Sequence, residues 1–150
     1  MPAFVTFGRI LFVVLFVFSG ASKLFDIAST TQAIADKVVL PAMLTTYTAE
    51  LEKMSGMPTA QMLAILTGVV EVAAGLFIGL NIGTRFFAFI LVLFVAVATF
   101  YFHNFWDMTG ADRINNMIHA LKNLSLIGGL LIIAGYPRPL PMEEERYTGV

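Results

Sequence analysis

The sequence predicts an all-α integral membrane protein, organised as an antiparallel, up-down bundle of four spanning helices. Of the 150 residues, 58% are hydrophobic and only 13% are charged, and the mean hydropathy is +0.83. Soluble domains have roughly 25% charged and 45–50% apolar residues. Apolar runs near the roughly 20 residues that cross a bilayer occur four times. None of them alternates with a period of two, which argues against a lipid-facing barrel.

The four expected spans differ in how many ionisable residues they carry. The spans cover about residues 4–25, 62–82, 86–102 and 115–135, which makes residues 1–135 one bundle domain. Arg9 and Lys23 interrupt the first span, and Glu71 is the only charged residue of the second. The third span has no charge, whereas the fourth carries His119 and Lys122 in its first half. These few residues are the candidates for chemistry inside the membrane.

The first connection, about residues 26–61, has a helical pattern of its own. Ile27, Ile34 and Val38 recur at helical spacing before Pro41, which would end that helix. A second set follows the proline at the same spacing: Leu44, Tyr47, Leu51 and Met54. We therefore expect two short amphipathic helices that lie on the membrane surface or cap the bundle. The other connections are a tight turn at 81–85 and a stretch of about a dozen residues at 103–114.

Residues 136–150 contain three prolines and an acidic cluster, and we expect an extended, solvent-exposed tail there. Four spans place both termini on one side of the membrane. Basic residues near the span ends are balanced, with Arg85, Arg138 and Arg146 on the terminal side and Lys37, Lys53 and Arg113 on the other. We favour cytoplasmic termini, because the short terminal-side loop carries its arginine at a helix end.

Glu71 is the least expected residue of the apolar spans. An acid at the bilayer centre costs about 2.5–3.5 kcal/mol on insertion scales, so it should face protein or water. Gly68, Gly75 and Gly79 share its helix face, and small residues at such spacing let another helix approach closely. Glu71 is therefore expected on a tightly packed seam between two helices.

Two cations of the first span are candidate partners for Glu71. Arg9 and Lys23 lie on one face of that helix, each roughly 10 Å along the axis from the expected level of Glu71. We favour Arg9 leaning inward over Lys23. The pair could be purely structural, fixing how the helices pack, or it could handle protons or face a ligand. These two interpretations are compatible.

A second group of polar residues gathers on the loop side, opposite the termini. It consists of His103, His119, Lys122 and Asn123, with Trp106 and Tyr101 as expected interfacial aromatic residues. Such side chains often cap helix ends or reach toward the headgroups. They would also suit a shallow pocket for a carbonyl-bearing lipophilic ligand such as a quinone. Gly128 and Gly129 mark close packing or bending in the fourth span.

Several function classes are disfavoured by composition. The chain has no cysteine, which excludes disulfides and thiolate metal sites. Two histidines without further ligands are weak evidence for a metal, so we expect no metal site and we disfavour haem. The net charge of -1 gives no sign of nucleic-acid binding. Few interior charges and glycine-lined seams argue against a substrate pore.

Four segments in order resemble the DoxX family of small bacterial membrane proteins with four helices. They are FSGASKLFD (18–26), VVEVAAGLFIGLNIGTR (69–85), HNFWD (103–107) and LKNLSLIGGLLI (121–132). Positions that recur in that family correspond to Arg9, Gly20, Lys23, Glu71, Gly75, Gly79, Arg85, His103, Phe105, Trp106, Asn123, Gly128 and Gly129. Residues 42–60 and the acidic tail depart from the pattern.

The resemblance implies a protein of the bacterial cytoplasmic (inner) membrane, associated with the lipid bilayer and with other subunits of a membrane complex. The family takes its name from subunits of a thiosulfate:quinone oxidoreductase, and distant relatives include eukaryotic cargo receptors. We expect a membrane subunit of an oxidoreductase complex, with a quinone as the ligand that would suit it and no catalytic activity of its own. The alternatives are an accessory subunit that only packs onto a larger respiratory or photosynthetic complex, and, less favoured, a carrier for a small lipophilic or acidic solute.

Overall fold

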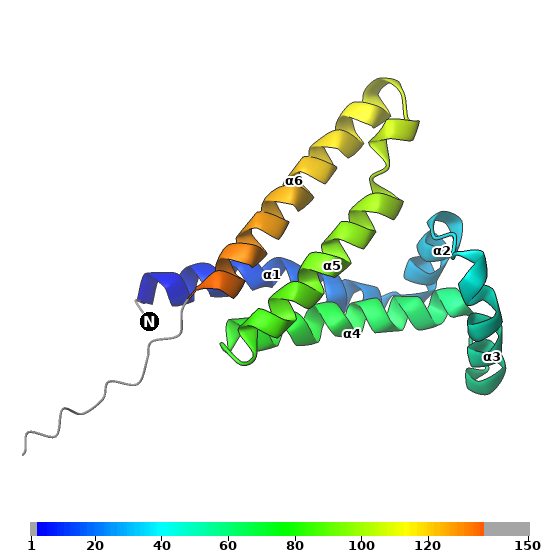
Figure 1. Ribbon diagram of the computed structural model, residues 1–150, viewed down its shortest axis with the longest axis horizontal. Coiled ribbons are helices and arrows are strands. Elements are labelled where there is room, and N and C mark those ends of the chain that lie inside the picture. The colour runs from blue at the N-terminus through cyan, green and yellow to red at the C-terminus, as the bar shows by residue number, and fades with distance from the viewer. Residues whose placement is uncertain (1–2, 137–150) are drawn as a thin grey trace, which may run out of the picture.

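The computed structural model describes residues 3–136, which fold into helices joined by short connections (Figure 1). The long helices are α1 (Ala3–Phe25), α4 (Thr59–Gly79), α5 (Thr84–Phe102) and α6 (Gly110–Gly135). The short elements are α2 (Ile27–Lys37), η1 (Ala42–Leu44), α3 (Thr45–Ser55) and η2 (Phe105–Asp107). Within residues 3–136, four helices are long and apolar enough to cross a membrane. The predicted all-α architecture with four spans is confirmed.

The four long helices form two antiparallel pairs. α1 packs along α4, and α5 packs along α6 (Figure 1). The two pairs meet near the α4–α5 turn and diverge toward the loop side (Figure 1). The start of α1 and the end of α6 lie at the same, terminal-side end of the molecule (Figure 1).

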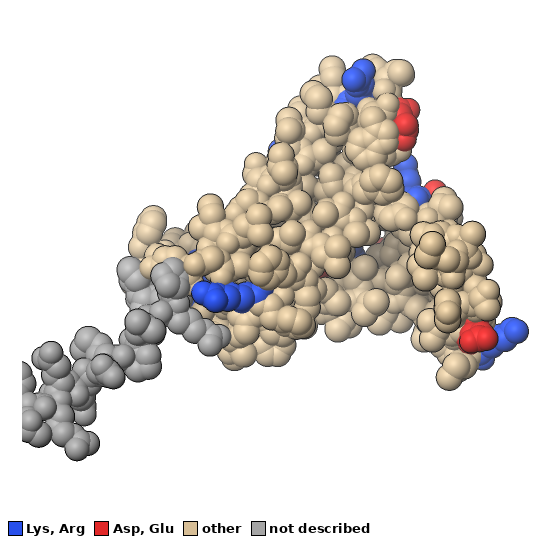
Figure 2. All heavy atoms as spheres, viewed as in Figure 1, with Lys and Arg blue, Asp and Glu red and all other residues tan. Residues whose placement is uncertain are grey.

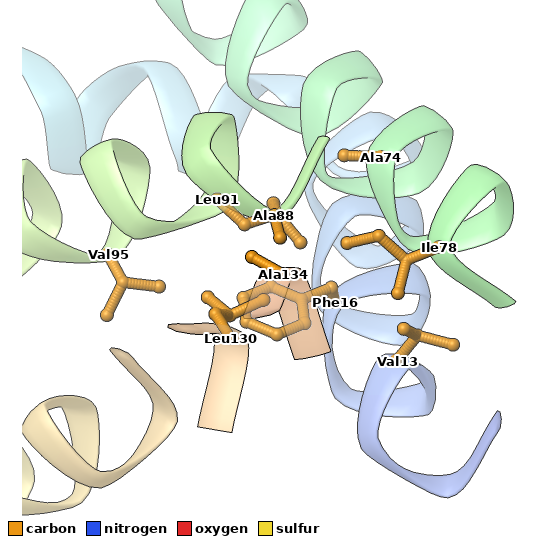
Figure 3. Packing of buried hydrophobic residues seen from close by; sticks show 9 residues of the cluster. All are labelled: Val13, Phe16, Ala74, Ile78, Ala88, Leu91, Val95, Leu130 and Ala134. Carbon is orange, nitrogen blue, oxygen red and sulfur yellow. The ribbon is translucent and has the colours of Figure 1, made fainter. Parts of the chain in front are cut away.

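The apolar core lies where the two pairs meet. Its buried residues come from all four long helices: Val13, Phe16, Ala74, Ile78, Ala88, Leu91, Val95, Leu130 and Ala134 (Figure 3). Leu91 and Leu130 are completely inaccessible, and Ala74 and Ala88 let the helices approach between them. The core positions of α4 and α6 lie in the last part of each helix, and Ala88 and Leu91 lie in the first part of α5, so the core occupies the terminal-side half. The loop-side half is left open by comparison.

Large apolar side chains cover the outside of the spans. Examples that are more than half exposed are Phe4, Phe7, Phe18, Leu66, Phe86, Phe89, Leu93, Leu124 and Ile132. A water-soluble protein rarely shows so continuous an apolar surface. At 1.5 Å per residue the 23 residues of α1 extend about 34 Å, which matches a hydrocarbon core of about 30 Å. The exposed side chains are therefore the surface that the lipid contacts.

Glycines hold α1 and α4 together, as the sequence predicts. A methyl group placed on Gly20 would lie 2.6 Å from the carbonyl oxygen of Gly68, and one on Gly75 would lie 2.9 Å from Val17. A methyl group on Gly79 would be in ordinary contact with Val13, at 3.4 Å. Because only hydrogen fits at Gly20, the two backbones can approach closely enough to fix the register of the pair.

The two glycines predicted to pack in the fourth span behave differently. A methyl group on Gly129 would lie 2.6 Å from the ring of Phe12, so this glycine does mark a close contact with α1. A methyl group on Gly128 would have no atom within 4 Å, so the predicted close packing does not apply to this glycine, and helix bending there stays a prediction. Adjacent residues point about 100° apart on a helix, so one of two neighbouring glycines faces α1 while the other does not.

The turn between α4 and α5 is as tight as predicted. Asn81 and Gly83 adopt left-handed φ angles of 62° and 56°, and the Ile82 N–H donates to the Phe77 carbonyl at 2.8 Å. Such a left-handed residue with a backward hydrogen bond is a common way to end a helix. The turn brings Asn81 close to the first part of α1, where its side chain accepts a hydrogen bond from Arg9.

The first connection contains the two short helices that were predicted. α2 buries Ile34 and packs on α4, whereas no residue of α3 is buried. Glu52 attaches α3 to the start of α4, because its Oε1 accepts hydrogen bonds from the Thr59 amide and hydroxyl, both at 2.6 Å. These bonds favour the carboxylate and hold the pKa of Glu52 below its ordinary value. That the two helices lie in the membrane interface stays a prediction.

Two helices begin earlier than their apolar runs indicate. α4 starts at Thr59, directly after Pro58, and α6 starts at Gly110, ahead of the predicted residue 115. The first turns of α6 have the sequence DRINN, so hydropathy alone does not include them although the backbone is helical. The predicted extended tail from residue 137 onward lies outside the described residues.

Gly20→Ala should destabilise the protein, because the added methyl group meets backbone rather than a side chain that could move. Overpacking of this kind typically costs about 1–3 kcal/mol. Gly128→Ala is the matched control, since its methyl group meets open space and alanine is the better helix former by about 1 kcal/mol. Thermal unfolding in detergent should show a lower midpoint for the first variant and an unchanged or higher one for the second. Equal midpoints would contradict the close α1–α4 contact.

Candidate functional site

A buried ion pair lies between α1 and α4. The Lys23 ammonium contacts Glu71 Oε2 at 2.5 Å and donates a second hydrogen bond to the Ser19 hydroxyl at 2.7 Å. Ser19 in turn donates to Glu71 Oε1 at 3.1 Å. Only 3% of the Glu71 side chain is exposed, against 27% for Lys23. Both carboxylate oxygens therefore have a donor, which is the condition for keeping a charge in an apolar interior.

The helix pattern explains why these three side chains meet. Ser19 and Lys23 are four residues apart, so they lie one above the other on one face of α1. Gly20, between them in sequence, lies against Gly68 and the Cβ atom of Glu71, which brings the two backbones together at this level. The sequence analysis did not identify Ser19 as a candidate site residue. The feature that could have indicated it is its four-residue spacing from Lys23, which places both side chains on one face of the helix.

The preference for Arg9 as the partner of Glu71 is wrong. Arg9 is buried at the terminal-side end, where its Nη1 donates to Asn81 Oδ1 at 2.7 Å. The register of α1 against α4 decides between the two cations. Because Gly20 lies level with Glu71, Lys23 is only about 4.5 Å further along the axis, whereas Arg9 is about 16 Å away. Hydropathy locates a span in the sequence, but it does not show how that span is aligned along its neighbouring helix to within one helical turn.

The Lys23–Glu71 pair lines a cavity of about 810 Å³ on the loop side of the core. Its polar residues also include Ser19, Ser22, Asp26, Ser29, Thr30, Thr67, His103 and Asn123. Phenylalanines make up much of the rest, at positions 16, 18, 94 and 102. The Lys23 ammonium lies 5.7 Å from the centre of the Phe94 ring, close enough for a cation–π contact. The cavity occupies the space where the helix pairs diverge, and Figure 2 shows the molecule hollowed between α5 and the α2–α4 side.

Only part of the predicted loop-side polar cluster lines the cavity. His103 and Asn123 line the cavity, together with Lys23 and Glu71. Asn123 is held in place because its amide nitrogen donates to the Thr99 hydroxyl at 2.9 Å. His119 and Lys122 are exposed and are not part of the cavity lining. Both side chains are on the exposed surface of α6. The helical spacing of residues 115, 119 and 122 shows that they share a face, but it does not show whether that face points toward the cavity.

The two histidines do contact each other. The rings of His103 and His119 stack with their centres 5.0 Å apart, and His103 Nδ1 lies 3.1 Å from Asn116 Oδ1. Within residues 3–136, no group of three or more His, Asp or Glu side chains is placed to hold a metal ion. The stack therefore connects a residue of the cavity wall to an exposed residue of α6.

The predicted interfacial aromatic residues lie together at the loop side. Trp106 is about half exposed and packs beside Phe100 and Phe105, with ring centres 5.7 and 5.3 Å apart. The Tyr101 hydroxyl donates to the Val39 carbonyl at 3.1 Å, which connects the end of α5 to the segment after α2. Their contact with lipid headgroups stays a prediction.

Comparison with known proteins identifies the family of the chain. The family model described as DoxX matches residues 4–104, which is two thirds of the chain. The chain belongs to the DoxX family. It is also 30% identical to the inner membrane protein YphA of Escherichia coli strain K12 over 133 residues, which are 89% of this chain and 82% of that protein. No solved structure matches the chain.

Membership of the DoxX family settles the cellular setting. With four apolar spans and an inner-membrane relative, this DoxX protein is a multi-pass protein of the bacterial inner membrane. The matched region ends at residue 104, so it includes Lys23, Glu71 and His103 but not Asn123. The cavity thus combines residues from the matched region with residues of α6.

A double-mutant cycle on Lys23 and Glu71 should reveal strong coupling. Lys23→Met leaves a buried carboxylate without its cation, and Glu71→Gln leaves an ammonium without its anion. Breaking a buried pair costs about 3–5 kcal/mol, whereas removing both charges is often nearly neutral. The unfolding free energy of the double variant in detergent should therefore lie closer to that of the wild type than the sum of the two single losses indicates. Purely additive losses would show that the pair is not formed.

Proposed function

We propose that this DoxX protein is a membrane subunit of an oxidoreductase complex, in which the cavity binds the head of a lipophilic, carbonyl-bearing molecule of the quinone class. The observation that supports the proposal is the lining of the cavity. Charged and amide donors come from α1 and α6, and four phenylalanines make up much of the remaining lining. Sites for small molecules are mostly apolar, with a few placed polar groups, and measure about 300–1,000 Å³.

The donors in the cavity suit a carbonyl oxygen. The Lys23 ammonium, the Asn123 amide and the His103 ring all face this space. An aromatic head would stack on the phenylalanine rings while its oxygen accepts a hydrogen bond. Reduction of a quinone to a hydroquinone takes up two electrons and two protons. A redox partner subunit must supply the electrons, and Lys23 and His103 are the groups of this chain that would deliver protons to the oxygens.

The cavity also has the access that a lipid-soluble ligand needs. Leu15 and Phe18 contribute to its lining, yet 49% and 73% of their side chains are exposed on the outside of α1. Because α1 is a spanning helix, this opening faces the hydrocarbon region rather than water. A ligand with an isoprenoid or alkyl tail would enter sideways from the bilayer and leave its tail among the lipids.

Binding of a short-chain quinone should depend on Lys23 but not on Lys122. Decylubiquinone added to the protein in nanodiscs should quench Trp106, the single tryptophan, with saturation. Lys23→Met removes a charged donor from the cavity, and such hydrogen bonds contribute about 1.5–3 kcal/mol, so the apparent Kd should rise at least about tenfold. Lys122→Met removes the same charge from an exposed position and should leave Kd unchanged.

The double variant Lys23→Met/Glu71→Gln keeps the interior neutral and separates loss of binding from loss of folding. It should unfold near the wild-type temperature and still bind weakly. Quenching that does not saturate, or that is equal in all three variants, would rule out the cavity as the quinone site.

A purely structural accessory role is the second candidate, and α3 favours it. This helix has no buried residue, and Tyr47, Leu51 and Met54 are 52% to 85% exposed. An apolar face of this kind beside the bundle would suit contact with a partner subunit as well as with lipid. In this role, the cavity would have no chemistry of its own.

Purification from native membranes in a mild detergent should distinguish the two roles. We expect a flavin-, haem- or molybdenum-containing oxidoreductase in fixed ratio, with Glu71→Gln lowering its quinone turnover but leaving the ratio unchanged. Under the accessory role, Leu51→Glu would abolish association while Glu71→Gln would leave turnover as in the wild type. Isolation of the chain without any redox protein would contradict the oxidoreductase proposal.

A further inference from the structure

Two histidines connect the cavity to the surface of the protein, and the proposed quinone function so far uses one of them. His103, the residue that follows α5, is half-buried and lines the cavity. His119, in the first half of α6, is exposed and lies outside the lining. Their rings stack with centres 5.0 Å apart and planes inclined by 14°, so His119 covers one face of the His103 ring. The pair therefore reaches from the surface of α6 to the wall of the cavity.

Asn116 determines which nitrogen of His103 carries the proton when the ring is neutral. The Asn116 amide nitrogen donates to the Asp112 carbonyl at 3.0 Å, one turn earlier in α6, which leaves its Oδ1 for the histidine. His103 Nδ1 lies 3.1 Å from this oxygen. Because an amide oxygen only accepts hydrogen bonds, Nδ1 is the donor, and the lone pair of a neutral His103 is on Nε2.

The second ring nitrogen of His103 is available for proton transfer. Within residues 3–136, His103 Nε2 has no hydrogen-bond partner. Imidazole takes up and releases protons near neutral pH, and the hydrogen bond at one nitrogen sets which nitrogen exchanges its proton. His103 can therefore gain and lose a proton at Nε2 while it keeps its bond to Asn116.

The position of His119 in α6 places it close to the boundary between lipid and water. The 26 residues of α6 extend about 39 Å, which is longer than a hydrocarbon core of about 30 Å. The excess lies at the polar start of the helix, where Asp112, Arg113, Asn115 and Asn116 precede His119. The cavity, by contrast, opens to lipid beside Leu15 and Phe18, which cannot supply protons. His119 thus stands between the source of protons and the place where a quinone would need them.

We propose that His119 passes protons from water to His103, which donates them from Nε2 to the oxygen of the reduced ligand. This inference rests on the proposed quinone function, in which a redox partner subunit supplies the electrons. The His103 imidazolium gives up its Nε2 proton and becomes the neutral tautomer that Asn116 stabilises. Its Nε2 then takes a proton from the His119 imidazolium, and His119 takes one from water.

The geometry of the stack determines how the two rings exchange a proton. Stacked rings do not hydrogen-bond face to face, so a bridging water molecule at the ring edges carries the proton between them. One passage supplies one of the two protons that a hydroquinone needs. A second passage replaces the proton that Lys23 gives to the other oxygen. His119 thus acts through His103 and does not touch the ligand.

Other ionisable groups around the histidine pair define the competing route for protons. Those on the described surrounding elements are Asp107 of η2, Asp112 and Lys122 of α6, and Lys23, Asp26 and Glu71 in the cavity lining. Asp26 is the competitor, because it is an exposed acid that lines the cavity. It is also the N-cap of α2, where it accepts a hydrogen bond from the Ser29 amide at 3.0 Å. Asp26→Asn removes the acid and keeps a good N-cap residue, so it is the matched control.

Proton exchange between His103 and water tests the route without any quinone. Solid-state NMR of nitrogen-15 histidine in bilayers measures this exchange by polarisation transfer from water, and the chain has only two histidines to assign. A neutral His103 should carry its proton on Nδ1. His119→Phe keeps a stacked ring that cannot transfer protons, and it should slow the exchange at least about tenfold, because acid–base groups contribute about 10²–10⁴-fold to such transfers. Asp26→Asn should exchange as the wild type does.

Quinone turnover of the purified oxidoreductase complex gives the functional result. His119→Phe should lower turnover at least about tenfold and leave the apparent Kd of decylubiquinone unchanged, because His119 does not line the cavity. Imidazole added to His119→Ala should restore part of the turnover, which it would not do if His119 had only a packing role.

The outcomes distinguish the proton route from the quinone proposal. Saturable quinone binding, together with equal exchange in the wild type and His119→Phe, would overturn the route and leave the quinone proposal intact. Slower exchange in His119→Phe without any quinone binding would support the route into the cavity and contradict the quinone as its acceptor. Exchange that is slowed by Asp26→Asn and not by His119→Phe would overturn the route, because protons would then enter beside α2.

Discussion

The Lys23–Glu71 ion pair is the interaction on which the loop-side half of the structure depends. An unpaired acid in an apolar span is costly, and this one is almost fully enclosed. The pair is tolerated only because Ser19 completes the hydrogen bonding and because Gly20 lets α4 come close enough for a lysine to reach the carboxylate. Removing either the glycine contact or either charge would therefore disturb the same region.

The same pair gives the cavity its chemical character. The core holds all four long helices together only in the terminal-side half, and the two helix pairs diverge beyond it (Figure 1). Without charged residues, the space between them would be an apolar gap filled by lipid. Lys23 and Glu71 make one wall polar, and α5 and α6 contribute His103 and Asn123 from the other side. An amphiphilic ligand would match this division better than a wholly apolar one.

The two ends of the bundle have opposite chemistry. The loop side combines a compensated ion pair with amide, hydroxyl and imidazole groups around a large cavity. The terminal side has two arginines, a helix start and a small pocket.

Much of the fold could be predicted from sequence because its physical cause is local. Apolar length gives the four spans, Pro41 separates α2 from α3, and the glycines on the face of Glu71 indicate a close partner helix. The partner of Glu71 could not be predicted, because Arg9 and Lys23 differ only in helix register, which the contact between Gly20 and Gly68 sets between segments far apart in the chain. The surroundings of three residues of α6 could not be predicted for a similar reason: His119, Lys122 and Gly128. A step of one residue along a helix moves the side chain to another face, and the sequence pattern does not show which face meets the neighbouring helices. The cavity itself follows from the divergence of the helix pairs, a tertiary property with no signal in hydropathy.

Solid-state NMR of the protein in lipid bilayers tests the central claim most directly. With nitrogen-15 and carbon-13 labels, a dipolar cross-peak should join Lys23 Nζ to Glu71 Cδ, and it should disappear in Lys23→Met. We expect that peak and no comparable one from the Arg9 guanidinium. A cross-peak from Arg9 to Glu71, or a Glu71 carboxyl without any cationic neighbour, would contradict the register of α1 on α4 and with it the polar wall of the cavity.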